Sequence, residues 1–147
     1  MTSSETQTVD RETIANDFRE RMQGKLDEDK IDAAVEGITA ATGVYPANGE
    51  IASMIFYVRV GVQVTGGKSF VGDGGGAFTP GGGALFGNVY TDDIDTVYGR
   101  TVSFEVNATP VYLSVLFFDS NSNLLGHFQS GGISTVTGVG GGTGSWS

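Results

Sequence analysis

Apolar and polar residues alternate along much of residues 43–147, and this period of two is typical of β-strands. Every even position of residues 52–64 is apolar, and residues 101–109 repeat the pattern, as expected for antiparallel strands that are wet on one face. Residues 111–118 are apolar at nearly every position, which indicates a strand covered on both sides. Further short runs occupy residues 84–91, 124–129, 132–139 and 143–147. Strands this short and regularly spaced predict a sandwich or a barrel.

Glycine is concentrated in the same part of the chain, since all of the 24 glycines except Gly24 and Gly37 lie in residues 43–147. Clusters at residues 74–76, 81–83 and 140–142 are compatible with flexible loops. Single glycines within strand patterns are expected where a sheet bends or where backbones approach closely; they are Gly61, Gly87, Gly126 and Gly138. A small closed barrel needs such corners. Its interior would be filled by phenylalanines, leaving little lumen; the candidates are Phe56, Phe104, Phe117 and Phe128.

One short helix is predicted within the strand-rich part, at residues 92–98. Thr91 or Asp92 can cap its first turn. Asp93 and Asp95 place negative charge at the positive end of the helix dipole.

Residues 1–42 differ in character, since they carry ten acidic and five basic residues against seven and three in the rest of the chain. Apolar side chains recur at helical spacing in two places, which are Ile14, Phe18 and Met22, then Ile31, Ala34, Val35 and Ile38. Two short amphipathic helices fit this pattern. A flexible tail fits equally, because each apolar stripe is narrow and residues 1–9 are polar. We therefore expect an acidic arm over residues 1–42, disordered or partly helical, and a separate barrel over residues 43–147.

Composition excludes several classes of protein. The chain has 147 residues and a net charge of −9, so a nucleic-acid backbone would be repelled, and we expect no nucleic-acid partner. No apolar run approaches the roughly 18 residues of a membrane-spanning helix. The absence of cysteine and the single histidine exclude disulfides and the usual structural zinc sites. The first 18 residues lack a basic segment followed by an apolar core, so they do not predict a secretory signal peptide.

Four segments carry a resemblance to a known family, and they are GGKSFVGDGGG (66–76), PGGGALFGNVYTDD (80–93), VSFEVNA (102–108) and YLSVLFFDSNSNLLGHFQSGGISTVTGVGGGTGSW (112–146). In this order they resemble the Vap family, the virulence-associated proteins of a pathogenic actinobacterium of the Rhodococcus type. The resemblance spans roughly residues 43–147. It implies a compact eight-stranded antiparallel closed β-barrel of two Greek keys, with one short helix and a mobile or partly helical N-terminal arm.

The same resemblance carries functional expectations. It implies a secreted or surface-attached protein that promotes bacterial survival in host macrophages by acting on the phagosome and lysosome. The sequence as it stands would then be a mature form or an atypical member. No enzymatic activity and no ligand-binding residues are carried over, so we expect no catalytic, cofactor-binding or metal-binding residues and no cofactor. We expect a monomer whose partner is lipid of the host endolysosomal membrane or a host protein.

Candidate chemistry in the residues themselves is sparse. His127 is expected to be a surface or half-buried strand residue that titrates between neutral and acidic compartments. Asp92, Asp93 and Asp95, with Glu50 or Glu105, are candidates for a carboxylate pair or a cation site, although helix capping already explains the aspartates.

Other motifs have structural interpretations. The strings at residues 66–69 and 72–74 mimic phosphate-binding loops but lack the required spacing, so we interpret them as turns. Asn107-Ala108-Thr109 is an incidental glycosylation sequon. Trp146 and Tyr112 are expected to pack in the core or at a barrel end.

These observations favour a non-enzymatic barrel that acts through its surface. One alternative is a barrel that holds a small apolar ligand or lipid, which needs an apolar lumen or end pocket above about 300 Å³. A second alternative is an acid-active hydrolase, which needs two carboxylates facing each other in a cleft within about 5–10 Å.

Overall fold

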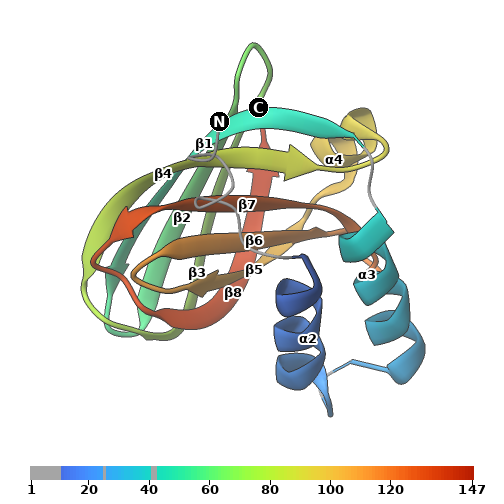
Figure 1. The fold of residues 1–147 in the computed structure, drawn as a ribbon, viewed down its shortest axis with the longest axis horizontal. Coiled ribbons are helices and arrows are strands. Elements are labelled where there is room, and N and C mark those ends of the chain that lie inside the picture. Colours follow the sequence, from blue (N-terminus) through green and yellow to red (C-terminus); the bar gives the residue numbers. More distant parts are fainter. Residues whose placement is uncertain (1–10, 25, 41–42) are drawn as a thin grey trace.

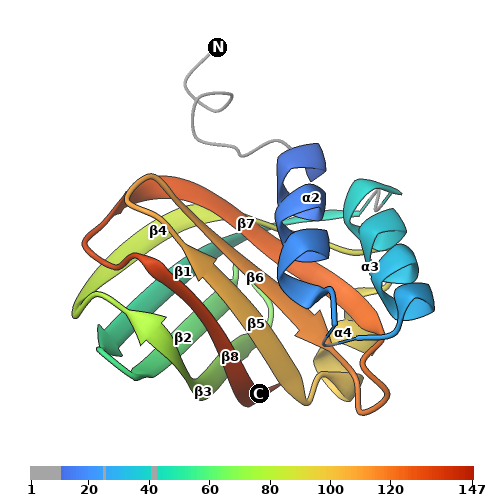
Figure 2. The same cartoon turned by 90° about the horizontal axis from the view of Figure 1, so that it is seen from below.

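A computed structural model describes residues 11–24, 26–40 and 43–147, and its main feature is a closed barrel of antiparallel strands (Figures 1 and 2). The eight strands among these residues are β1 (Val44–Met54), β2 (Tyr57–Val64), β3 (Ser69–Phe78), β4 (Gly81–Tyr90), β5 (Ser103–Ala108), β6 (Tyr112–Phe118), β7 (Leu124–Ser134) and β8 (Gly138–Trp146). Their order around the barrel is β1-β2-β3-β8-β5-β6-β7-β4, and β4 pairs with β1 to close the ring. The neighbours β4-β1-β2-β3 and β8-β5-β6-β7 each form a Greek key, which confirms the predicted fold.

The first hairpin changes which positions face the interior. Strand β1 buries its odd positions, whereas β2 buries its even positions. Between them, Ile55 and Phe56 form a two-residue turn, because Met54 pairs directly with Tyr57. The single alternating run predicted over residues 52–64 is therefore two strands. The prediction that Phe56 fills the interior is wrong, since this side chain at the tip is 77% exposed.

Aromatic rings fill the interior. Phe70 lies at the centre, with its ring centroid 5.0 Å from Phe117, 5.5 Å from Trp146 and 5.7 Å from Phe104. Phe104, Phe117 and Phe128 are buried in this core, as predicted. Each fully buried phenyl contributes about 1.5–3 kcal/mol relative to an exposed one.

The glycine clusters lie within strands rather than in loops. Residues 74–76 belong to β3, residues 81–83 to β4 and residues 140–142 to β8. Where strands β3 and β8 pair, glycines of one strand lie opposite glycines of the other, as Gly74 lies opposite Gly142. A Cβ built on Gly142 would lie 2.1 Å from the carbonyl oxygen of Asp73. Glycine is required there because no side chain fits between the two backbones.

The predicted short helix is present as α4 (Ile94–Arg100). Its N-cap is Asp93, not Thr91 or Asp92. The Asp93 carboxylate accepts a hydrogen bond from the Thr96 N–H at 3.1 Å and another from the Thr96 hydroxyl at 2.7 Å. Thr91 instead donates its hydroxyl to the carbonyl of Leu125 at 2.8 Å, which ties the segment before α4 to strand β7.

Two helices precede the barrel, α2 (Arg11–Met22) and α3 (Glu28–Ala40), and they lie against one side of it (Figure 2). Their apolar residues pack with the outward side chains of β6. This second core contains Ile14, Ala15, Phe18, Ala34, Ile38, Leu116 and Phe118. Strand β6 is accordingly buried on both faces, as its continuous apolar sequence predicts. Residues 11–22 and 28–40 are thus helical, whereas residues 1–10 lie outside the described part of the chain.

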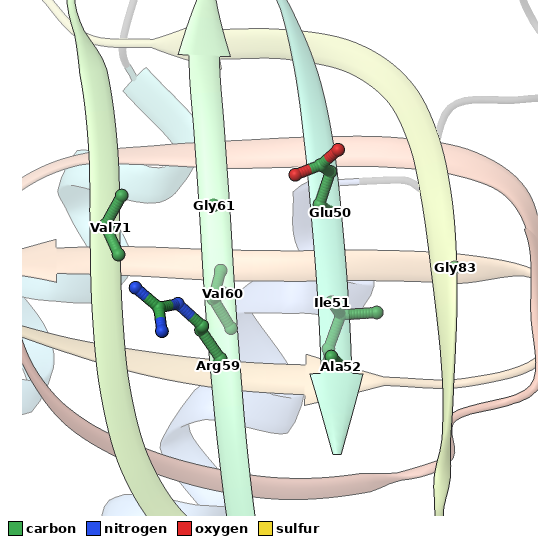
Figure 3. Close-up of a pocket in the computed structure, with 8 residues that line it drawn as sticks. All are labelled: Glu50, Ile51, Ala52, Arg59, Val60, Gly61, Val71 and Gly83. Atoms are coloured by element: carbon green, nitrogen blue, oxygen red, sulfur yellow. The ribbon is translucent and has the colours of Figure 1, made fainter.

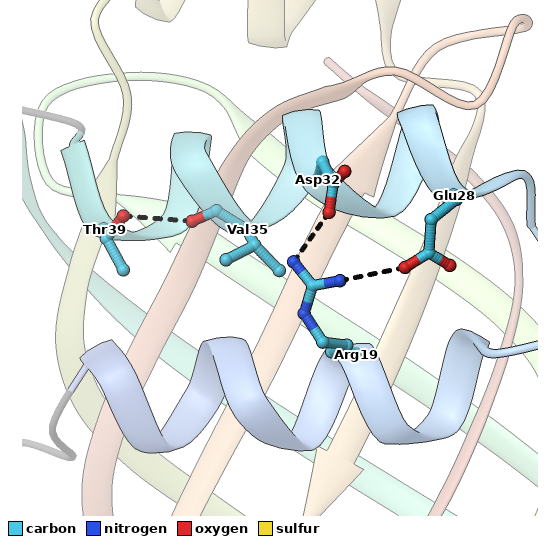
Figure 4. A network of polar contacts seen from close by, with 5 residues as sticks. All are labelled: Arg19, Glu28, Asp32, Val35 and Thr39. Carbon is cyan, nitrogen blue, oxygen red and sulfur yellow. Dashed lines mark hydrogen bonds and ion pairs between the residues drawn. The ribbon is translucent and has the colours of Figure 1, made fainter.

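An ion-pair network joins the two helices (Figure 4). Arg19 of α2 reaches Glu28 at 3.2 Å and Asp32 at 2.8 Å, both on α3. Neither helix, nor any other in the described residues, is both long and apolar enough to cross a membrane.

Candidate functional site

The candidate sites lie on the outside of the barrel, because the interior is occupied by the aromatic core. A hollow of about 320 Å³ lies on the outer wall across β1, β2 and β3 and reaches the start of β4 (Figure 3). Small residues line it, since Ala52 has only a methyl group and Gly61 and Gly83 have no side chain. A second hollow of about 210 Å³ shares Glu50, Gly61 and Val71 with the first. The two form one shallow groove over β1–β3.

Charged side chains border this groove. Glu50 extends from β1 and Arg59 from β2 (Figure 3). The Arg59 Nε lies 3.9 Å from a carboxylate oxygen of Asp73, and both side chains are more than half exposed. Tyr57 donates its hydroxyl to the same carboxylate, and this hydrogen bond raises the pKa of the Tyr57 phenol. These charged side chains could bind polar groups of a ligand only weakly, because solvent-exposed ion pairs contribute little binding free energy.

A further hollow of about 350 Å³ lies where α3, α4 and the start of β7 meet. It is lined by Asp92 and Asp93 among others. Hydrogen bonds from the Thr96 side chain and backbone lower the pKa of Asp93, which favours its ionised form. A general acid requires a raised pKa, so the Asp93 carboxylate is suited to capping the helix rather than to proton donation.

The candidate carboxylates are not gathered in one cleft. Asp92 and Asp93 line the hollow beside α4, Glu50 lines the groove over β1–β3, and Glu105 is buried on β5. Asp95 lies in the first turn of α4 and lines neither hollow. Within the described residues, no group of three or more His, Asp or Glu side chains is arranged to hold a metal ion.

His127 is fully buried, so the prediction of a surface or half-buried histidine is wrong. It lies on β7 opposite Leu116 of β6, which belongs to the core beneath the helices. Its ring stacks on Tyr90 with centroids 5.3 Å apart, and its Nδ1 lies 3.0 Å from the Gln129 amide nitrogen. The nearly continuous apolar sequence of β6 was the signal for this burial, because a strand next to one that is covered on both faces can be covered by the same elements.

The other singled-out motifs have structural roles. The string at residues 66–69 forms the β2–β3 turn, as predicted, with Gly66 at a φ of +75°. Residues 72–74 lie inside β3 and are not the predicted turn. Asn107 of the sequon donates its amide to the Tyr112 hydroxyl at 2.9 Å. That hydroxyl also lies 3.3 Å from the Asp17 carboxylate, so Tyr112 packs between barrel and helix α2.

The hairpin tip at Met54, Ile55 and Phe56 is exposed, which the alternating pattern did not predict. The alternating pattern had placed positions 54 and 56 on a buried face. The uninterrupted apolar run over residues 54–58 was the available signal, since it breaks the alternation. Exposed apolar side chains that are adjacent in a turn can mark a site of interaction with a partner.

Comparison with known proteins identifies relatives of the chain. A family model described as Rhodococcus equi virulence-associated protein matches residues 3–147. Virulence-associated protein VapB from Rhodococcus equi has a solved structure that is 43% identical, with a TM-score of 0.67, covering 71% of this chain and 96% of its own. The structure of VapD from the same organism is 37% identical, with a TM-score of 0.69, covering 71% and 97%. No curated protein sequence matches the chain significantly.

Proposed function

Because the chain belongs to the family of Rhodococcus equi virulence-associated proteins, we propose that it is a secreted virulence protein that promotes bacterial survival inside host macrophages. Its place of action is the phagosomal and lysosomal compartment. It acts there as a monomer and without catalysis, through contacts of its outer surface with host lipid or host protein.

The filled interior is the observation that carries this proposal. A barrel that stores a ligand needs an empty lumen, whereas here Phe70, Phe117 and Trp146 pack ring against ring inside the wall. The hollows of about 320 and 350 Å³ are open to solvent on the outer wall and have carboxylates in their lining. The outer surface is therefore where we expect partners to bind.

The separation of the carboxylates supports a role without catalysis. Glycoside hydrolysis needs two carboxyl groups on either side of one bond, about 5–10 Å apart. Glu50 and Asp93 line different hollows, and the Asp93 carboxylate is engaged by Thr96.

A macrophage infection experiment tests the proposal. A bacterial strain that lacks this protein should multiply less in macrophages and should reside in more acidic phagosomes, and the unaltered protein should restore both. The protein should also be found in the culture medium. Normal growth of the deletion strain, or retention of the protein inside the bacterium, would contradict the proposal.

A matched variant separates surface action from catalysis. The double substitution Asp93→Asn and Asp95→Asn removes two of the candidate carboxylates while retaining a side chain that caps helices well. We expect this variant to restore intracellular growth fully. Failure to restore growth, with normal folding and secretion, would favour the hydrolase alternative.

A further inference from the structure

Four hairpin loops gather at one end of the barrel, on the left in Figures 1 and 2. They are the β1–β2 tip (54–57), the β3–β4 loop (78–81), the β5–β6 loop (108–112) and the β7–β8 loop (134–138). Backbone hydrogen bonds join neighbouring loops: Phe78 N–H to Ile55 O at 2.8 Å, Thr79 N–H to Thr137 O at 2.9 Å and Ser134 N–H to Pro110 O at 3.4 Å.

The four loops contain no charged residue. Charged side chains reach them at two places, where the Tyr57 hydroxyl donates to Asp73 and the Tyr112 hydroxyl donates to Asp17. Each loop lies within a longer stretch without Asp, Glu, Lys or Arg, and these stretches, residues 51–58, 74–91, 106–118 and 128–147, continue along the barrel wall, although the chain has 17 acidic and eight basic residues. The opposite end carries charges on its connections, including Lys68, Asp92, Asp93, Asp95, Arg100 and Asp119. We call the four loops the uncharged end.

Large apolar side chains project from the uncharged end. Phe56 is 77% exposed, Met54 72% and Ile55 54%, all at the β1–β2 tip. Val111 on the β5–β6 loop is 69% exposed. Tyr57 follows the tip with its hydroxyl held by Asp73 further along the wall. The β1–β2 tip is therefore apolar, and the other three loops carry Thr79, Pro80, Thr109, Pro110, Thr135 and Thr137.

A lipid bilayer is the partner that fits this surface best. Stable protein interfaces bury about 800 Å² on each side, whereas the few side chains of a hairpin tip offer only a few hundred. The hydrocarbon region of a bilayer excludes charge, and the uncharged end meets that condition. Aromatic and hydroxyl side chains suit the headgroup level.

The backbone of the tip is also suited to transfer from water into a bilayer. Unpaired N–H and C=O groups are costly in hydrocarbon. Met54 pairs with Tyr57 across the hairpin, and the Ile55 carbonyl accepts the Phe78 N–H. The tip therefore exposes apolar side chains, while at least one carbonyl group of its turn is already hydrogen-bonded and would not be left unpaired in the bilayer.

We infer that the uncharged end inserts shallowly into a lipid bilayer, with Met54, Ile55 and Phe56 entering first. This inference deepens the proposed function, on which it rests for the identity of the host membrane. The contact itself is apolar and requires no particular headgroup charge, so neutral phosphatidylcholine suffices as the lipid.

The experiment uses the full chain and unilamellar phosphatidylcholine vesicles at neutral pH, with flotation to measure the bound fraction. Phe56→Asp should lower the partition coefficient at least about tenfold, since it removes a phenyl and adds a charge. The matched control is Phe86→Asp, because Phe86 is 63% exposed on the outer wall of β4, away from the tip. The control should bind within about twofold of the unaltered chain.

A spectroscopic measurement locates the contact. Phe56→Trp should give an emission that shifts to the blue with vesicles and is quenched by brominated phosphatidylcholine. The native Trp146 is buried, so the unaltered chain should show little quenching and serves as the reference.

Several results would overturn the inference: no binding of the unaltered chain to neutral vesicles, equal losses for Phe56→Asp and Phe86→Asp, or an unquenched Trp at position 56. Self-association abolished by Phe56→Asp, without vesicle binding, would assign the tip to a contact between copies. A failed infection experiment with intact vesicle binding would refute the proposed host role but not the membrane contact.

Discussion

Glycine at the β3–β8 seam shows how single residues determine whether the barrel closes. Gly74 and Gly142 face each other across the two strands. A Cβ on Gly74 would lie 2.2 Å from the Gly141 carbonyl oxygen, so both strands must lack side chains at this point. The glycines of this seam are therefore a requirement of close backbone approach, not a sign of loops.

Substitution Gly142→Ala should destabilise the protein by about 2 kcal/mol or more, because the new methyl group would force the two backbones apart. Gly99→Ala is the matched control, since no heavy atom lies within 4 Å of its added Cβ and it lies in α4. Alanine there should stabilise by up to about 1 kcal/mol. Urea unfolding of both variants checks this. Equal stability would show that the seam relaxes without cost.

Asp93 makes stability depend on pH through a single carboxylate. The hydrogen bonds from Thr96 lower the pKa of Asp93 in the folded protein below its ordinary value of 3.8. A lowered folded pKa contributes stability that is present above the unfolded value and is lost as the pH falls through the folded value. We expect the NMR titration midpoint of the Asp93 carboxyl to lie below 3.8.

The Asp93→Asn variant supplies the comparison in stability. Its unfolding midpoint should fall less than that of the unaltered chain as the pH is lowered from 5 to 3. A titration midpoint at or above the ordinary value would contradict the cap seen between Asp93 and Thr96.

Among the elements, the helix pair is bound to the barrel by a small core of its own. Phe18 of α2 stacks on Phe118 of β6 with ring centroids 6.0 Å apart. This core is separate from the aromatic core inside the barrel, so the two can be disturbed independently.

Phe18→Ala should release the helix pair while leaving the barrel folded. Replacing a buried phenylalanine costs about 3–5 kcal/mol, and the loss should be confined to the core beneath the helices. Amide exchange in α2 and α3 should then accelerate by about a hundredfold or more, with little change in β1–β3. Arg19→Ala, which removes only partly exposed ion pairs, should change exchange by less than about tenfold. Uniform acceleration across the barrel would show that helices and barrel unfold together.

The elements also show which parts of the fold a sequence reveals. Alternation identified β5, and a nearly continuous apolar run identified β6, because each face of these strands meets one environment along its length. It missed β3, whose glycines leave too few side chains to alternate. The phase change at Ile55–Phe56 was hidden as well, because a two-residue turn interrupts the pattern without a glycine or proline to mark it. The burial of His127 depended on helices that pack from far away in the sequence.

At the scale of the whole molecule, the distribution of charge is more informative than the total. The uncharged segments are visible in the sequence, yet only the strand order brings their four loops to one end. The groove bordered by Glu50 and Arg59 also depends on the topology, since β1, β2 and β3 each supply part of it. A residue list alone predicts neither surface.

The acidic total predicts a pH effect on membrane association. At neutral pH the chain carries a net charge of −9, and its isoelectric point is about 4.3. Anionic vesicles should therefore repel it at pH 7, whereas at pH 5, nearer the isoelectric point, the net negative charge is smaller and the repulsion is weaker. Binding to vesicles containing phosphatidylserine should rise several-fold between pH 7 and pH 5, and added salt should reduce the difference. Phosphatidylcholine vesicles are the control and should bind about equally at both pH values, since the four loops contain no Asp, Glu or His that could titrate between them. An equal rise in binding to neutral vesicles would instead indicate a conformational change at acidic pH. The membrane-binding surface would then belong to a rearranged barrel rather than to the one described above.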